Sequence, residues 1–126
     1  MKKLLAAAVA ALTLIFGGCA EPSGYQQITQ EEAAEIMENE SGYIILDVRT
    51  EQEYNGGHIP GAICVPNESI SDAPPEQLPD KNRLILVYCR SGRRSKQAAQ
   101  KLADMGYTDV REFGGINTWQ GETTAQ

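Results

Sequence analysis

Two short, continuous runs of apolar residues constrain the fold more than any other feature of this sequence. The first, Tyr43–Leu46, directly precedes Asp47, and the second, Leu84–Tyr88 within the expected strand Arg83–Tyr88, directly precedes Cys89. Unbroken apolar runs of about four to eight residues are typical of strands that are buried on both faces. Because such strands occur mainly in parallel sheets covered by helices, the two runs predict a parallel sheet between helical layers.

Helix signals alternate with these strand signals. In Thr29–Glu32 and in Thr50–Glu53, a threonine is followed three residues later by a glutamate, which is the pattern of a capping box. We therefore expect a helix over 30–39 and a short helix that stops at 55–57. The other expected elements are strands at 25–28, 62–65 and 109–113, a surface loop at 71–82, a helix over 95–105 and a short helix near Trp119. This alternation predicts an α/β fold.

Cys89 stands at the end of the second apolar run, where its surroundings favour a reactive thiolate. Ligands of parallel α/β sheets bind at the carboxyl ends of strands, and a six-residue turn, Cys89–Arg94, leads from this end to the next helix. Gly92 lets the turn curl so that its amide N–H groups point inward, and the helix N-terminus adds positive potential. Three arginines add positive charge: Arg90, Arg93 and Arg94. Each effect lowers the pKa of the thiol, whereas an inert buried cysteine and a solvated basic loop are the alternatives.

Five segments of the chain, taken together, resemble the motifs of a known protein family. They are Leu46–Arg49, Glu53-Tyr54, Gly57–Ala62, Val87–Ser95, and Gly114–Ile116 with Trp119. Together and in this order they resemble the single-domain rhodaneses, a thiosulfate sulfurtransferase family, and most of all its exported phage-shock type. The resemblance extends over 25–120 and implies a three-layer α/β/α fold with a five-stranded parallel sheet of order 3-2-4-5-1.

The resemblance implies a sulfurtransferase that acts in two steps without a cofactor. The Cys89 thiolate would take the outer sulfur of thiosulfate or a similar small anion, and cyanide or a thiol would then accept it from the Cys89 persulfide. The loop residues that would hold the sulfur and attract the donor are Arg90, Ser91, Gly92, Arg93, Arg94 and Ser95. Many family members have a lysine where this chain has Ser91, so the donor stays open. The alternative is a persulfide carrier or sulfur-binding module that serves a partner protein.

The length of the loop after Cys89 argues against phosphatase activity. The related cell-cycle phosphatases and arsenate reductases need Cys-x5-Arg to wrap a tetrahedral oxyanion. In this chain the corresponding position is Ser95, and Arg94 comes one residue too early. The shorter loop fits a sulfur atom better than a phosphoryl group.

Several other polar or aromatic side chains are interpreted as structural. Arg49 is expected to pair with Asp47 or Glu53, and His58, the only histidine, to support a turn. Trp119 is expected to cover the core.

Cys64 is interpreted as a small buried apolar residue. In the strand order that the resemblance implies, Cys64 and Cys89 are two strand spacings apart, roughly 9–10 Å. A disulfide requires Cα atoms within roughly 7 Å, so we expect none between them. One histidine and scattered cysteines also give no set of metal ligands.

The N-terminal residues have the pattern of an export signal. Lys2 and Lys3 precede the apolar run Leu4–Phe16, which is shorter than the roughly 20 residues of a membrane-spanning helix. The segment Phe16–Cys19 resembles the lipobox of bacterial lipoproteins, so we expect lipidation of Cys19 and anchoring to the outer side of the cell membrane. The alternative is ordinary cleavage after Ala20, which would give a secreted or periplasmic soluble protein.

Four segments follow from these patterns. We expect a signal peptide at 1–18, a lipid-anchored tether at 19–24, the rhodanese-like domain at 25–120 and a disordered tail at 121–126. The formal net charge of −6 argues against nucleic acid as a partner. The expected partners are a small sulfur-containing anion, a thiol or cyanide acceptor and the membrane, and we expect a monomer.

Overall fold

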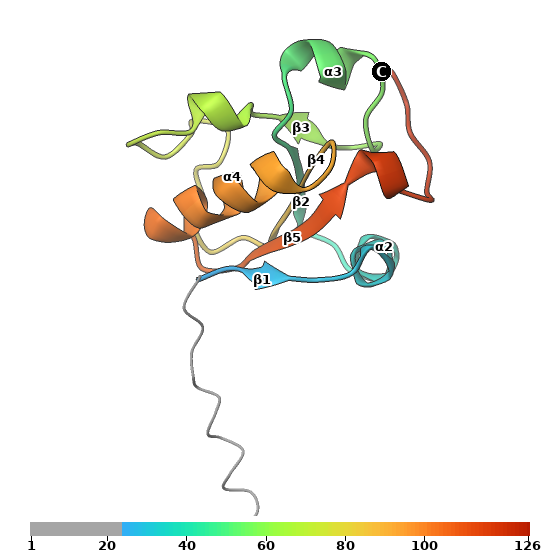
Figure 1. Ribbon diagram of the computed structural model, residues 1–126. Coiled ribbons are helices and arrows are strands. Elements are labelled where there is room, and N and C mark those ends of the chain that lie inside the picture. Colours follow the sequence, from blue (N-terminus) through green and yellow to red (C-terminus); the bar gives the residue numbers. More distant parts are fainter. Residues whose placement is uncertain (1–23) are drawn as a thin grey trace, which may run out of the picture.

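Five parallel strands lie in the order β1-β5-β4-β2-β3 in the computed structural model, which describes residues 24–126 (Figure 1). Their bounds are β1 Gln26–Gln27, β2 Ile44–Asp47, β3 Ile63–Cys64, β4 Ile85–Cys89 and β5 Val110–Gly115. This confirms the predicted α/β class and the order 3-2-4-5-1. The predicted signal peptide, Cys19 and the first residues of the tether lie outside the described residues.

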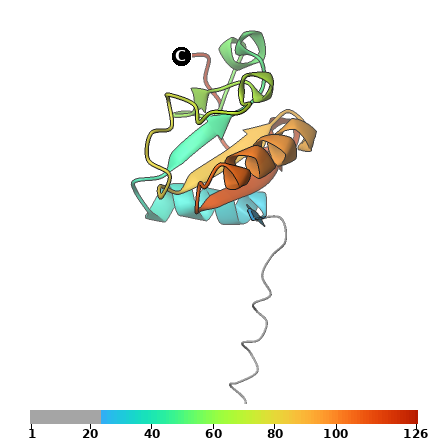
Figure 2. The same cartoon turned by 90° about the vertical axis from the view of Figure 1, so that its left-hand side faces the viewer.

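The central strand β4 is buried on both faces, as its unbroken apolar sequence predicts. Ile85, Val87 and Cys89 belong to the core beneath helix α4, Arg93–Asp104, whereas Leu86 and Tyr88 belong to the core beneath helix α2, Gln30–Asn39. Successive side chains of a strand point to opposite faces, so this alternation divides the core into two layers. Figures 1 and 2 show α4 and α2 on opposite sides of the sheet.

Both predicted capping boxes are present. Thr29 Oγ1 accepts a hydrogen bond from the Glu32 amide at 3.0 Å, and the Glu32 carboxylate accepts one from the Thr29 amide at 2.9 Å. Thr50 and Glu53 make the equivalent pair at the start of α3, Glu51–Asn55. These reciprocal bonds satisfy amide groups that would otherwise lack partners at a helix N-terminus, and they fix where each helix begins.

Helix α4 begins earlier than the sequence pattern predicts. It starts at Arg93 rather than Ser95, because Gly92, with a φ of 108°, ends the turn and serves as the helix N-cap. Only glycine adopts such a backbone conformation without strain, so the position that curls the turn also starts the helix. Arg93, Arg94 and Ser95 therefore belong to the first turn of α4 rather than to the loop or its boundary.

The C-terminal residues also differ from the expectation of a disordered tail. The short 3-10 helix η4, Ile116–Thr118, is followed by a segment that returns to the domain, where Thr124 and His58 exchange two backbone hydrogen bonds of 2.8 Å. This antiparallel bridge satisfies the backbone of both residues, which is why 121–126 is held against the domain. Within residues 24–126, no helix is long and apolar enough to cross a membrane.

Candidate active site around Cys89

The Cys89 side chain lies at the carboxyl end of β4, on the α4 side of the sheet. The regular pairing of β4 with β5 shifts between Val87 and Cys89, so that Cys89 lies opposite Gly115. This irregularity ends the strand pairing and lets the chain turn over the end of β5. Cys89 is only 1 % exposed, so its sulfur is enclosed by the turn that follows.

Hydrogen bonds from the turn stabilise a negative charge on this sulfur. The Gly92 amide donates to the Cys89 Sγ at 3.0 Å. Burial alone raises the pKa of the thiol, but the hydrogen bond with the Ser95 hydroxyl group and hydrogen bonds from the amides of Ser95, Gly92 and Ser91 outweigh it, so the pKa of Cys89 lies below its ordinary value. Thiolate is the nucleophilic form of cysteine, and an enclosed ring of amide donors also suits a bound sulfur anion.

A buried acid, which the sequence analysis missed, lies directly behind this turn. The Ser95 hydroxyl donates to Glu112 Oε2 at 2.5 Å and lies 3.5 Å from the Cys89 Sγ. Glu112 belongs to β5, is 1 % exposed, and also accepts a hydrogen bond from the Gly114 amide at 2.9 Å. The alternation of side chains along a strand could have predicted the burial of Glu112, because Glu112 is two residues after the buried Val110 and therefore lies on the same face of β5.

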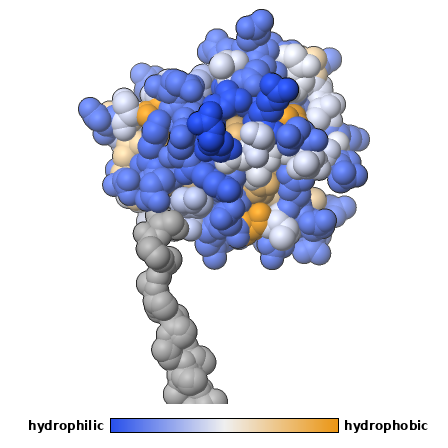
Figure 3. Space-filling view, viewed as in Figure 1, coloured by the Kyte–Doolittle hydropathy of each residue, from blue (hydrophilic) through white to orange (hydrophobic). Residues whose placement is uncertain are grey.

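The three predicted arginines have different positions. Arg94 forms two hydrogen bonds of 2.9 and 3.1 Å with the Glu53 carboxylate on α3, and this pairing holds the pKa of Glu53 at about 2. Arg94 therefore joins the helix that follows Cys89 to the helix that follows β2. Arg90 and Arg93 are exposed, and Figure 3 shows a mostly hydrophilic surface over α4. These two arginines add positive charge to the surface beside the turn.

The two neighbouring strand ends are tied together beneath the site. Arg49 pairs with Asp47 at 2.7 Å, which is one of the two partners predicted for it, and also donates to the Gly57 carbonyl at 2.7 Å. The Tyr88 hydroxyl donates to Asp47 Oδ2 at 2.7 Å. Because Tyr88 immediately precedes Cys89, this buried network fixes the backbone from which the thiol projects.

The turn after Cys89 is held against the end of β5. The Asn117 amide donates to the Arg90 carbonyl at 3.1 Å. Gly115 provides the space for this approach, since a Cβ atom there would lie only 2.1 Å from the Arg90 carbonyl oxygen. Gly115 has a φ of −126°, which any residue can adopt, so glycine is required there by space rather than by backbone conformation.

His58 and Trp119 have the structural roles that the sequence predicts for them. His58 is 2 % exposed, stacks on Tyr54 with a centroid separation of 3.7 Å, and has its Nδ1 2.8 Å from the Tyr54 carbonyl oxygen, so it supports the turn. Trp119 packs over Phe113 with a centroid separation of 5.6 Å, as expected of a core cover.

The prediction that Cys64 is buried is wrong. Cys64 is half-buried and lies on β3, the edge strand, where fewer neighbours cover it. Burial, followed by the negative charge of Asp47, raises the pKa of its thiol to about 11, so it is a poor nucleophile at neutral pH. Cys64 and Cys89 are both free thiols in the described part of the chain.

Other kinds of site find little support. Among residues 24–126, no group of histidine, cysteine and acidic side chains could hold a metal ion. Two surface depressions lie near Trp119 and α2, away from Cys89. Those depressions are lined mainly by apolar and amide side chains, whereas the thiol with the lowered pKa lies at the end of β4.

Comparisons with known proteins agree with this geometry. A model of the rhodanese-like domain matches residues 29–122. Thiosulfate sulfurtransferase PspE of Escherichia coli (strain K12) is 41 % identical over 71 residues, which cover 56 % of this chain and 68 % of that protein. Thiosulfate sulfurtransferase GlpE of Pseudomonas putida (strain KT2440) is 32 % identical over 105 residues, which cover 82 % of this chain and 93 % of that protein. A solved structure described as a rhodanese with anions from E. coli has a TM-score of 0.61 and 34 % identity, and the match covers 67 % of this chain and 99 % of that chain.

Proposed function

This chain belongs to the rhodanese-like domain family, and from that premise we propose that it is a sulfurtransferase that carries sulfane sulfur as a persulfide on Cys89. The observation that carries the proposal is the enclosed Cys89 thiol, whose sulfur accepts the Gly92 amide hydrogen at 3.0 Å and whose pKa is lowered by donors of its own turn.

In the first half-reaction, the Cys89 thiolate attacks the outer sulfur of thiosulfate or a similar donor. The S–S bond between Cys89 and the transferred sulfur forms, the bond from that sulfur to the sulfonyl sulfur breaks, and sulfite leaves with the electron pair. Cys89 becomes a persulfide anion, so the total charge does not change. The amides that stabilise the thiolate are the available donors for this anion, since they lie on the same turn.

In the second half-reaction, a nucleophile attacks the outer sulfur of the persulfide. Cyanide would form thiocyanate and a thiol would form a new persulfide, and in both cases Cys89 leaves as the thiolate. Because the first product departs before the acceptor reacts, the kinetics should be ping-pong. The low pKa of Cys89 serves this step too, since a more stable thiolate is a better leaving group.

Arg90 and Arg93 are proposed to attract the anionic donor. Both are exposed on the turn and the first residue of α4, whereas Arg94 is already paired with Glu53. Ser91 lies between Arg90 and Arg93 in the sequence and brings no charge of its own. The donor is therefore held near the site by long-range attraction rather than by a fixed ion pair within the turn.

A persulfide carrier is the second candidate, and the burial of Cys89 favours it. At 1 % exposure, the sulfur is shielded from bulk solvent, which protects a persulfide from loss to small thiols. A carrier would form a stable persulfide and pass it to a partner protein while turning over little free thiosulfate.

We also propose that the protein acts outside the cytoplasm on a lipid anchor at Cys19, on the basis of residues 1–19. Growth with radiolabelled palmitate would test this. The full chain should be labelled, and Cys19→Ala should not be.

The activity is tested with purified protein, thiosulfate and cyanide. Wild type and Cys64→Ser should produce thiocyanate at similar rates, and Cys89→Ser should produce none. Cys64→Ser is the matched control because it removes the other described thiol, which has a raised pKa. A stable persulfide without turnover would favour the carrier. Equal thiocyanate production by wild type and Cys89→Ser would refute both functions.

A further inference from the structure

Glu112 is a buried acid that the two half-reactions do not use. It lies on β5 in register with Gln27 of β1 and Val87 of β4, and it is 1 % exposed. Its Oε1 accepts a hydrogen bond of 3.4 Å from the Gln27 amide, and its Oε2 accepts bonds from Ser95 and Gly114. Among residues 24–126, no cation lies within ion-pair distance of it. Buried carboxylates are normally paired, so this one requires an explanation.

The Ser95 hydroxyl joins Glu112 to the nucleophile. Its oxygen is 2.5 Å from Glu112 Oε2, 3.0 Å from the Gly92 carbonyl oxygen and 3.5 Å from the Cys89 Sγ. A hydroxyl has one hydrogen to donate, and the shortest contact places it on the Glu112 carboxylate. The Cys89 thiol can then donate its own hydrogen to the Ser95 oxygen. The result is a continuous chain from S–H through O–H to the carboxylate.

We propose that Glu112 takes up the proton of Cys89 through Ser95. The proposal rests on the proposed function in one respect, which is that Cys89 is the nucleophile. The thiol proton passes to the Ser95 oxygen as the Ser95 hydroxyl proton passes to Glu112 Oε2. The products are a Cys89 thiolate, a neutral Glu112 carboxyl group and a Ser95 hydroxyl that donates to the thiolate. One negative charge is present before and after, so the site never has to bury two adjacent anions.

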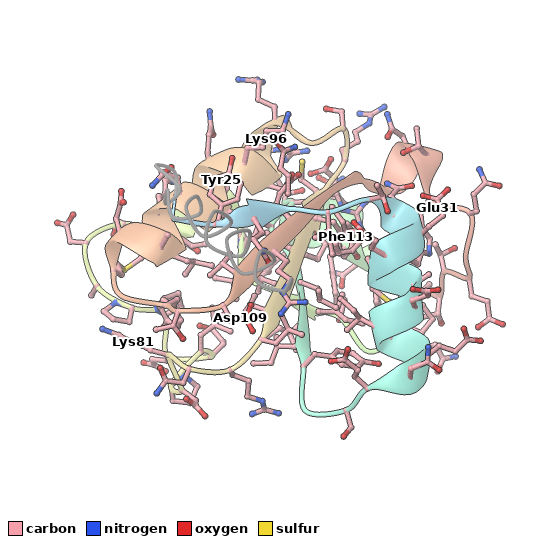
Figure 4. The ribbon with its side chains drawn as sticks, turned by 90° about the horizontal axis from the view of Figure 1, so that it is seen from below. Tyr25, Glu31, Lys81, Lys96, Asp109 and Phe113 are labelled. Atoms are coloured by element: carbon pink, nitrogen blue, oxygen red, sulfur yellow. The ribbon has the colours of Figure 1, made fainter. Side chains whose placement is uncertain are left out.

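The other groups around Glu112 do not compete for this proton. Tyr25, which precedes β1 and packs on the α4 side of the sheet, is the other titratable group that senses its charge (Figure 4). Burial, followed by the charge of Glu112, raises the pKa of Tyr25 above its ordinary value, so the phenol stays neutral while the thiol titrates. On the remaining sides, Gln27 of β1 and Ser95 of α4 contribute an amide and a hydroxyl.

A shared proton gives a distinctive titration. Two coupled groups lose their protons in two macroscopic steps that belong to the pair. Thiolate absorbance in the ultraviolet should therefore rise in two steps as the pH of the wild type is raised, with part of the amplitude in each. In Glu112→Gln the second group is gone, and the absorbance should rise in a single step. A carboxylate that only supports the fold would give one step in both proteins.

The titration is performed on the full chain carrying Cys19→Ser and Cys64→Ser, so that Cys89 is the one cysteine left. Glu35→Gln, on the exposed side of α2, is the matched control for loss of one acidic charge and should keep both steps. A single step in the wild type, or two steps in Glu112→Gln, would overturn the proposal.

Infrared difference spectra provide a test that does not depend on the folding of Glu112→Gln. When the pH is lowered through the upper thiolate step, the wild type should gain a protonated-carboxyl band as the pair takes up its first proton, and Cys89→Ser should gain none in that pH range. The absence of that band in the wild type, or an equal band in both proteins, would refute the proton transfer. Neither measurement needs a sulfur donor. A single titration step with normal thiocyanate production would refute this proposal alone, whereas two steps without any persulfide would refute the proposed function alone.

Discussion

Gly115→Ala should reduce sulfur transfer by displacing the turn that encloses Cys89. A Cβ atom at this position would lie 2.1 Å from the Arg90 carbonyl oxygen, 2.5 Å from the Arg90 carbonyl carbon and 2.6 Å from the Ser91 Cα. All three atoms are backbone, so no side chain can rotate away. Ordinary contact begins near 3.4 Å, and the turn must therefore retreat by about 1.3 Å.

The size of the effect follows from that displacement. A misplacement of about 1 Å in a reacting group can cost about 100-fold in rate, which corresponds to about 2.7 kcal/mol in activation free energy. We therefore expect kcat/KM for thiocyanate formation to fall by about 100-fold. Overpacking of this kind also lowers the free energy of unfolding by about 1–3 kcal/mol, so urea denaturation must show that the variant is folded under assay conditions.

Gly56→Ala is the matched control for the loss of a glycine. Gly56 has a φ of −82°, and a Cβ atom there would meet its nearest neighbours at 3.5 and 3.7 Å, which is ordinary contact. This variant should keep activity within about twofold, well below the loss of about 100-fold expected from a displaced site. If folded Gly115→Ala also kept wild-type kcat/KM, the turn would not hold the thiol in its reactive position, and the reasoning would be refuted.

Three further substitutions test the surroundings of the site. Tyr88→Phe leaves the buried Asp47 carboxylate without its 2.7 Å hydrogen bond and should lower the free energy of unfolding by about 1–3 kcal/mol in urea denaturation. Glu53→Gln should lower it by about 1 kcal/mol at pH 7, because a partly exposed ion pair with Arg94 is lost. Since the folded pKa of Glu53 is about 2 and its ordinary value is 4.5, this stabilisation is present above pH 4.5 and is lost as pH falls towards 2, where wild type and variant should converge. Arg93→Glu should raise the KM for thiosulfate about fivefold at low ionic strength and much less at 1 M salt.

Each of these predictions has its own control and its own contradictory result. Tyr43→Phe removes a hydroxyl whose acceptor is the half-exposed Met37 carbonyl, so it should cost less stability than Tyr88→Phe, and equal losses would contradict the buried network. A stability difference between wild type and Glu53→Gln that persists at pH 2 would exclude the ion pair as its cause. An increase in KM that does not depend on salt would show that Arg93 contacts the donor directly.

The sequence predicts much of the fold because its local signals and its tertiary structure agree. The unbroken apolar run of β4 is buried on both faces, and both capping boxes start helices where the pattern places them. Cys89 stood out as the candidate nucleophile because a cysteine that ends such a strand and precedes a glycine turn and a helix has few other interpretations.

The parts that the sequence did not predict depend on contacts between distant segments. Glu112 lies between Arg111 and Phe113, and glutamate is seldom fully buried, although the strand places it beneath α4 beside Ser95. The pairing of His58 with Thr124 joins residues that are far apart in the chain and has no local pattern. In the first turn of α4, the helix begins at Arg93 because Gly92 can adopt a positive φ, and no side-chain cap marks that boundary.

Mass spectrometry of the intact protein after incubation with thiosulfate tests the central claim most directly. The wild type and Cys64→Ser should each gain the mass of one sulfur atom, peptide mapping should place that atom on Cys89, and cyanide should remove it. Cys89→Ser should gain none. A sulfur atom found on Cys64, or no sulfur atom on the wild type with any sulfane donor, would contradict the assignment of Cys89 as the residue that carries sulfur.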